Sequence, residues 1–86
     1  MKDRHGNEVA VGDKVRVLEV CEDFLQSLPA EERRHIISML GNEYVIDDFP
    51  EPGKASVSTE WDYADGSRGY GGLYMLGHEF ELVRRS

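Results

Sequence analysis

Hydrophobic and polar residues alternate along Val11–Val20, and the predicted fold is built around this stretch. Val11, Val15 and Val17 fall on positions of the same parity, with charged residues between them. A two-residue period is typical of a strand with one buried face. We therefore predict a first strand over Lys14–Val20, and we expect its valines to face a partner sheet.

Further alternating segments downstream predict short antiparallel strands. The clearest is Lys54–Tyr63, in which Val57, Trp61 and Tyr63 share one face. Weaker alternation predicts the other strands at Asn42–Phe49, Leu73–Leu76 and about Phe80–Val83.

Turn residues separate the last of these strands. The stretch Ala64–Gly72 contains the tight-turn pair Asp65-Gly66 and predicts the tip of a hairpin. The pair Gly77-His78 predicts a tight corner made of a single 3₁₀ turn.

One helix is expected to interrupt the β pattern, at about residues 29–40. Pro29 suits the first helical position, where its missing N–H costs nothing. Ile36, Ile37 and Leu40 then form an apolar face, with Met39 at its edge. Because a helix of about twelve residues is marginal alone in water, we expect Ile36 and Leu40 to dock on one open end of the sheet.

Length and charge limit the classes of function. The 86 residues suffice for one domain, residues 1–86, and 40% of them are hydrophobic. The formal net charge is −7. Phosphate backbones and anionic membranes are bound by clustered Lys and Arg, so we expect neither nucleic acid nor a membrane as partner.

Cysteine content and the absence of long apolar runs favour a cytoplasmic location. Cys21 is the only cysteine, so no internal disulfide can form, which is typical of a reducing compartment. We expect Cys21 to be a small buried thiol, since its acidic neighbours would raise the pKa of a reactive one. Neither a signal peptide nor a run of 18 apolar residues is found.

The order of the predicted strands suggests a closed sheet. Short antiparallel strands in so small a chain usually form a barrel or roll, because closure removes open edges. The order resembles the SH3-like small β-barrel, on the segments VGDKVRV, LGNEYVIDDF, SVSTEWDY, GGLYML and LGHEFELV. The resemblance covers nearly the whole chain. It implies a mainly β fold, a five-stranded antiparallel SH3-like barrel with one α-helix inserted after the first strand.

Two other barrel families share part of this pattern. The opening V-G-D-x-V-x-V, with GNEYVI later, is similar to KOW-type barrels and to the barrel of nitrile hydratase β subunits. The chain also resembles small bacterial barrel proteins, a likeness that implies no activity. The inserted helix departs from the SH3 pattern, because it would fill the region where the RT loop shapes the SH3 peptide groove.

Four aromatic residues are the candidate binding site, because they fall on or near one hairpin: Trp61, Tyr63, Tyr70 and Tyr74. SH3-like domains bind extended ligands in aromatic-lined grooves. The alternative is that Trp61 and Tyr63 belong to the core face of their strand, with Tyr70 covering a patch of glycines.

The residue pattern gives no support for catalysis or metal binding. His5, His35 and His78 are scattered and lack the spacing of a zinc site. Asp47 and Asp48 lack the alternating ligand positions of a calcium loop. Neither a nucleophile elbow nor a phosphate-binding loop is present. We expect a protein that is not an enzyme and has no cofactor or metal.

The leading hypothesis is a non-catalytic protein- or peptide-binding module whose partner has a basic face. The alternative is an accessory subunit or small domain of a metalloenzyme, and RNA binding of the KOW type is a weaker third. We expect a monomer or a weak dimer.

Overall fold

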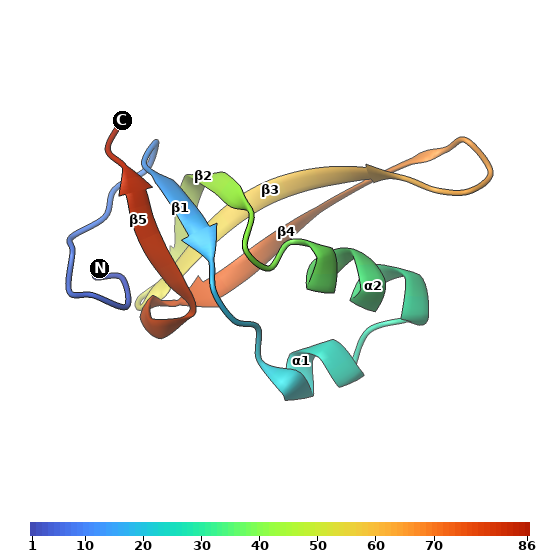
Figure 1. Ribbon diagram of the computed structural model, residues 1–86, viewed down its shortest axis with the longest axis horizontal. Helices are drawn as coiled ribbons and strands as arrows, with labels where there is room; N and C mark the ends of the chain where they lie inside the picture. The colour runs from blue at the N-terminus through green and yellow to red at the C-terminus, as the bar shows by residue number, and fades with distance from the viewer.

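The computed structural model describes residues 1–86 and contains one antiparallel sheet, two helices and a 3₁₀ turn (Figure 1). The strands are β1 (Lys14–Val17), β2 (Glu43–Glu51), β3 (Lys54–Asp62), β4 (Arg68–Leu76) and β5 (Phe80–Arg84). Between β1 and β2 lie α1 (Glu22–Gln26) and α2 (Ala30–Ser38), and η1 (Gly77–Glu79) joins β4 to β5. The predicted mainly β fold, with five antiparallel strands and a helix after the first, is confirmed.

The sheet has two edges, so the predicted closed SH3-like barrel is wrong. The strand order is β4-β3-β2-β1-β5, which leaves β4 and β5 unpaired with each other. The central strand β2 links two halves: Tyr44 pairs with Val15 of β1, and Ile46 pairs with Val57 of β3. Irregularities after Ile46 bend β2 between the halves without closing the sheet.

The N-terminal segment covers the outer edge of β5 and occupies backbone groups through which a further strand could pair. The Arg4 N–H donates to the Phe80 carbonyl at 3.0 Å. The Asp3 carboxylate accepts the Leu82 N–H at 2.7 Å and also the N–H of Asn7. Burial opposes ionisation of Asp3, but these donors outweigh it and hold the pKa below its usual value.

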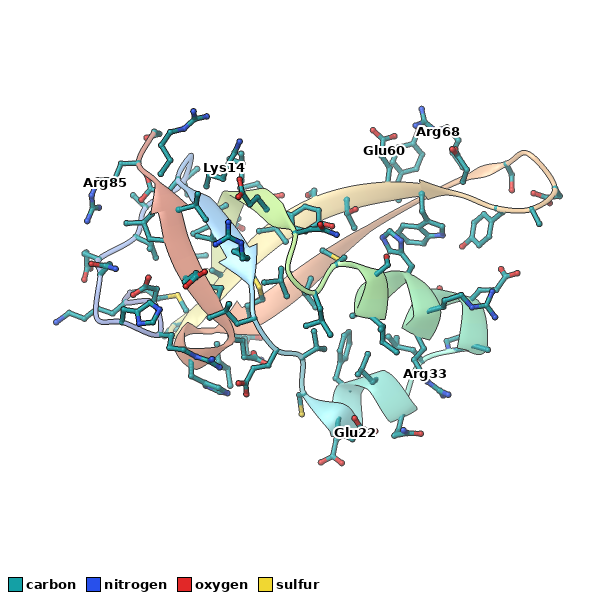
Figure 2. The ribbon with its side chains drawn as sticks, viewed as in Figure 1. Lys14, Glu22, Arg33, Glu60, Arg68 and Arg85 are labelled. Carbon is teal, nitrogen blue, oxygen red and sulfur yellow. The ribbon has the colours of Figure 1, made fainter.

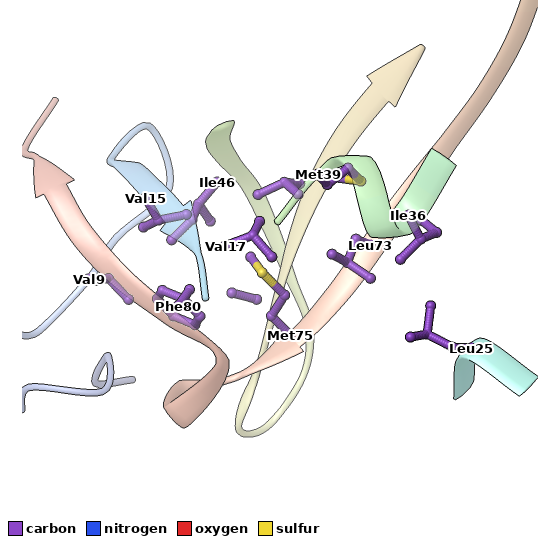
Figure 3. Packing of buried hydrophobic residues seen from close by; sticks show 12 residues of the cluster. Val9, Val15, Val17, Leu25, Ile36, Met39, Ile46, Leu73, Met75 and Phe80 are labelled. Carbon is purple, nitrogen blue, oxygen red and sulfur yellow. The ribbon is translucent and has the colours of Figure 1, made fainter. Parts of the chain in front are cut away.

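The hydrophobic core lies between the two halves of the sheet (Figure 3). Val15 and Val17 are fully buried there, as their alternation predicted. Val11 is instead 54% exposed, because a turn at Gly12, with φ of 97°, separates it from β1. The largest fully buried side chains are Phe80, Met39, Ile46, Leu73 and Met75.

The predicted helix is present as α2, but its buried face differs from the prediction. Ile36 is buried as expected, whereas Leu40 is exposed and Met39 is fully buried. The N–H groups of Met39 and Leu40 bond to carbonyls three residues back, so the chain tightens after Ser38. This tighter turn directs Met39 into the core and Leu40 outward.

The connection from β1 to α2 contains a second, short helix in addition to the one inserted helix that the sequence predicted. Cys21 precedes α1 and is exposed, so the expected buried thiol is wrong, because β1 ends at Val17. Arg33 of α2 fixes α1 beside it: its guanidinium donates to the carbonyls of Leu25 at 2.9 Å and Leu28 at 3.0 Å (Figure 2). Neither helix has the length and hydropathy that a membrane span requires.

The β3–β4 hairpin extends well beyond its neighbours (Figure 1). Pairing of β2 with β3 begins at Val57, so residues 58–72 form a two-stranded arm. The predicted tip Ala64–Gly72 is wrong in its second half, because β4 already begins at Arg68 and pairs with Asp62. Glu60 and Arg68 extend from the side of the arm away from the helices (Figure 2).

We expect Val15→Asp to unfold the protein. Val15 is fully buried, and an unpaired carboxylate there costs several kcal/mol against a total stability of about 5–15 kcal/mol. The matched control is Val45→Asp in β2, where the side chain is 49% exposed; it should cost about 1 kcal/mol or less. Urea unfolding followed by circular dichroism measures both. A cooperative transition of normal midpoint for Val15→Asp would contradict the assigned core.

Candidate functional site

The side chain of Trp61 lies flat against β4 on the inner side of the arm. The register places Trp61 opposite Gly69 and Thr59 opposite Gly71. A Cβ atom built on Gly69 would lie 2.6 Å from Trp61 Cε2, and one on Gly71 would lie 3.0 Å from Cη2. Both glycines are therefore required by the close approach of the indole to the backbone.

His35 of α2 stacks on the indole and joins the helix to the arm. The two ring centroids are 4.3 Å apart with an interplanar angle of 30°. The Thr59 hydroxyl lies 3.5 Å from His35 Nε2, at the limit of a hydrogen bond. Desolvation by burial lowers the pKa of His35 below its usual value of 6.5, so the neutral imidazole is favoured.

One polar atom of the indole has no partner. Trp61 Nε1 is shielded from solvent and makes no hydrogen bond, and it faces β4 at Gly69. An unsatisfied buried donor costs about 1–3 kcal/mol. The fold tolerates this cost, and nothing in the surroundings of Nε1 explains it.

A groove of about 150 Å³ opens between the two helices and the arm, and we call it the Trp61 groove. Its apolar walls come from three elements: Phe24 of α1, Leu28 of the connection and Ile36 of α2. Trp61 and the backbone of β4 close the opposite side. The remaining lining residues are Glu32, His35, Thr59, Tyr70, Gly71 and Gly72.

The four aromatic residues predicted as one binding site lie on two faces of the arm. Trp61 and Tyr63 share the inner face and contact each other edge to face, with centroids 6.0 Å apart. Tyr70 and Tyr74 lie opposite Glu60 and Ser56 in the register, which places their side chains on the outer face. The two tyrosines of β4 are highly exposed, at 73% and 57%. The structure therefore brings together Trp61 and Tyr63 only.

Sequence reasoning missed the helical half of this site. Phe24 is 39% exposed and Leu28 is half-buried, and both lie just outside the predicted helix and were not proposed as site residues. His35 was considered only as a possible metal ligand. The one signal in the sequence for this half of the site is Phe24, an apolar residue in a short polar segment.

Charged groups around the Trp61 groove are mainly acidic. Glu32 lines the groove itself, and Glu31, Asp62 and the basic Arg34 line a shallower hollow of about 310 Å³ on the far side of His35 and Trp61. Arg33 donates its hydrogen bonds to backbone carbonyls rather than to these carboxylates. No group of three or more His, Cys, Asp or Glu side chains is placed to hold a metal ion.

The chain has no detectable relative among the proteins compared with it: no family model, no curated protein and no solved structure matches it. The observations that bear on function are therefore the geometry and charge of the Trp61 groove.

We expect Gly69→Ala to displace the indole and loosen α2. The added methyl group would overlap the indole ring, and overpacking of this kind costs about 1–3 kcal/mol. Urea unfolding gives the free energy, and the emission maximum of Trp61 should move to longer wavelength as the ring is exposed. Tyr70→Ala, at the next residue and highly exposed, is the control. It should change neither the free energy of unfolding nor the emission maximum of Trp61. Unchanged emission from Gly69→Ala would contradict the contact.

The stability of the protein should fall as the pH decreases below about 6.5. Because His35 has a lowered pKa in the folded state, the unfolded chain takes up the proton first, and this favours unfolding. Well above pH 6.5, His35 is neutral in both the folded and the unfolded state, so it no longer makes the stability depend on pH.

The measurement is the free energy of unfolding at pH 7.5 and at pH 5.5. His35→Phe keeps a ring beside Trp61 but cannot titrate, so its stability should fall less than that of the wild type. An equal loss in both proteins would show that His35 is not the group responsible.

Proposed function

We propose that this protein is a non-catalytic binding module that holds an extended peptide segment of a partner protein in the Trp61 groove. The observation that carries the proposal is the groove itself, in which apolar side chains of α1, α2 and their connection face an indole across open space. Exposed apolar surface gathered in one concave place is typical of an interaction site.

The size of the groove favours a peptide side chain over a small-molecule ligand. Sites for drug-sized ligands and cofactors have volumes of about 300–1,000 Å³. An apolar cavity of about 150 Å³ takes a group the size of benzene, and the Trp61 groove has this volume. One aliphatic or aromatic side chain of a partner therefore matches the space available.

Charge favours a basic partner. The protein carries a formal net charge of −7, and Glu32 lies in the wall of the groove. Complementary charge increases the rate of encounter and selects among partners. The segment bound would therefore present an apolar side chain flanked by Lys or Arg.

The geometry of the polar groups supports binding rather than catalysis. His35 is the one imidazole in the groove, and the nearest hydroxyl, that of Thr59, is 3.5 Å from Nε2. An activated nucleophile usually lies about 2.6–3.2 Å from its base. Stacking on Trp61 also assigns His35 a packing role.

Peptides selected from a random heptapeptide library on the immobilised protein test this proposal. Trp61 is the only tryptophan, so its fluorescence reports binding in the groove directly. We expect the selected peptides to combine an apolar residue with Lys or Arg and to shift the emission of Trp61.

Phe24→Ala should weaken binding of these peptides about tenfold, because it removes one apolar wall of the groove. Ile37→Ala is the matched control, since Ile37 is an exposed apolar residue of α2 outside the groove, and it should bind as the wild type does. Failure to enrich any peptide, or equal binding by Phe24→Ala, would refute the proposed function.

A further inference from the structure

The hydrogen-bonding pattern of the arm shows which backbone groups of β4 point away from β3. At the end of the arm the Tyr63 N–H donates to the Ser67 carbonyl at 2.8 Å, so these two residues form a hydrogen-bonded pair. In an antiparallel ladder such pairs alternate with non-hydrogen-bonded ones. The register then makes Tyr70 and Gly72, opposite Glu60 and Ser58, members of non-hydrogen-bonded pairs.

The other end of β4 agrees with this assignment. Leu76 has the same parity as Tyr70, and its N–H donates away from β3, to the Glu79 carboxylate at 2.7 Å. The N–H and C=O groups of Tyr70 and Gly72 therefore face the outer edge of the sheet. Apart from the ladder with β3, no residue from Arg68 to Met75 makes a backbone hydrogen bond.

The two edges of the sheet thus differ. The edge of β5 is covered by Asp3 and Arg4, whereas the edge of β4 is open at Tyr70 and Gly72. The exposed strand here carries neither proline nor lysine, the residues that usually protect such edges. Gly71 and Gly72 are both exposed, so few side-chain atoms obstruct an approaching backbone.

The open edge lies along the Trp61 groove. Tyr70, Gly71 and Gly72 line the same cavity as Trp61 and Phe24. Phe24 also lies beside Gly72 on the outer side of the strand, so it marks the end of the accessible edge. The edge available to a partner is therefore about five residues long, Arg68–Gly72, which is a typical strand length.

We propose that the partner segment binds by adding to β4 as a further strand of the sheet, which rests on the proposed function of the groove. Its backbone pairs with the free N–H and C=O groups of Tyr70 and Gly72. Side chains alternate along a strand, so one apolar residue of the segment enters the groove beside Trp61 and its two neighbours do not. The residues on either side of it point to the outer face, where Glu60 pairs with Arg68 and the Asp47 carboxylate accepts the Ser58 hydroxyl.

Proline at position 70 tests this mode of binding without disturbing the ladder. The N–H of Tyr70 faces the open edge, and proline is tolerated on edge strands at such positions. Tyr70→Pro removes the donor and blocks the approach of a strand, whereas Tyr70→Ala removes only the exposed side chain. The probe is a peptide selected on the wild-type protein, titrated against Trp61 fluorescence.

We expect Tyr70→Pro to bind the selected peptide at least about tenfold more weakly than Tyr70→Ala does. On binding to the wild type, the amide protons of Tyr70 and Gly72 should exchange more slowly with solvent. Circular dichroism and the urea midpoint of Tyr70→Pro check that the arm is intact. If the midpoint falls, slower exchange of the two amides in the wild type decides the question alone.

Other outcomes separate this proposal from the proposed function. If Phe24→Ala weakens binding while Tyr70→Pro does not and the amides exchange as before, strand addition is overturned and binding in the groove stands. If Phe24→Ala also binds normally, both are overturned. If the wild type is a dimer in light scattering and Tyr70→Pro is a monomer, the occupant of the edge is a second copy of this chain, which overturns a peptide partner.

Discussion

The contact between the indole of Trp61 and the backbone of β4 determines where α2 and the arm lie relative to each other. Gly69 and Gly71 leave the surface of the strand bare, so the ring can lie flat on it. His35 then stacks on the ring from the helix side. Aromatic pairs of this kind contribute about 0.5–1.5 kcal/mol beyond the area they bury, and here they join elements that share no backbone ladder.

The protein therefore has two differently stabilised parts. Around Phe80, Val15 and Ile46 the chain is held by a continuous hydrophobic core and by strand pairing, and the N-terminal segment seals the edge of β5. Beyond Val57 the arm is only two strands wide, and such a hairpin is marginal in water without a packing partner. The two helices pack against only part of the arm. Their incomplete contact leaves the Trp61 groove beside an open strand edge.

Residue alternation sufficed to predict the first part of the fold but not the second. It correctly placed Val15, Val17 and Trp61 on inner faces, since each side chain sits in a strand with a period of two. Gly69 and Gly71 of β4 were misread as part of a hairpin tip, because their role depends on the ring of Trp61 on the neighbouring strand. Tyr70 was likewise grouped with Trp61, although the register places the two on opposite faces. The prediction of a closed sheet was wrong, and the residue pattern gave no sign that Asp3 and Arg4 bond to the outer edge of β5.

The central claim is that the indole of Trp61 is packed between the glycines of β4 and the imidazole of His35. Proton NMR of the free protein tests it most directly. The account predicts nuclear Overhauser contacts from the indole protons to the α protons of Gly69 and Gly71 and to the ring of His35, with those glycine α protons shifted upfield by the ring current. Glycine α protons at random-coil positions, with no such contacts, would contradict it.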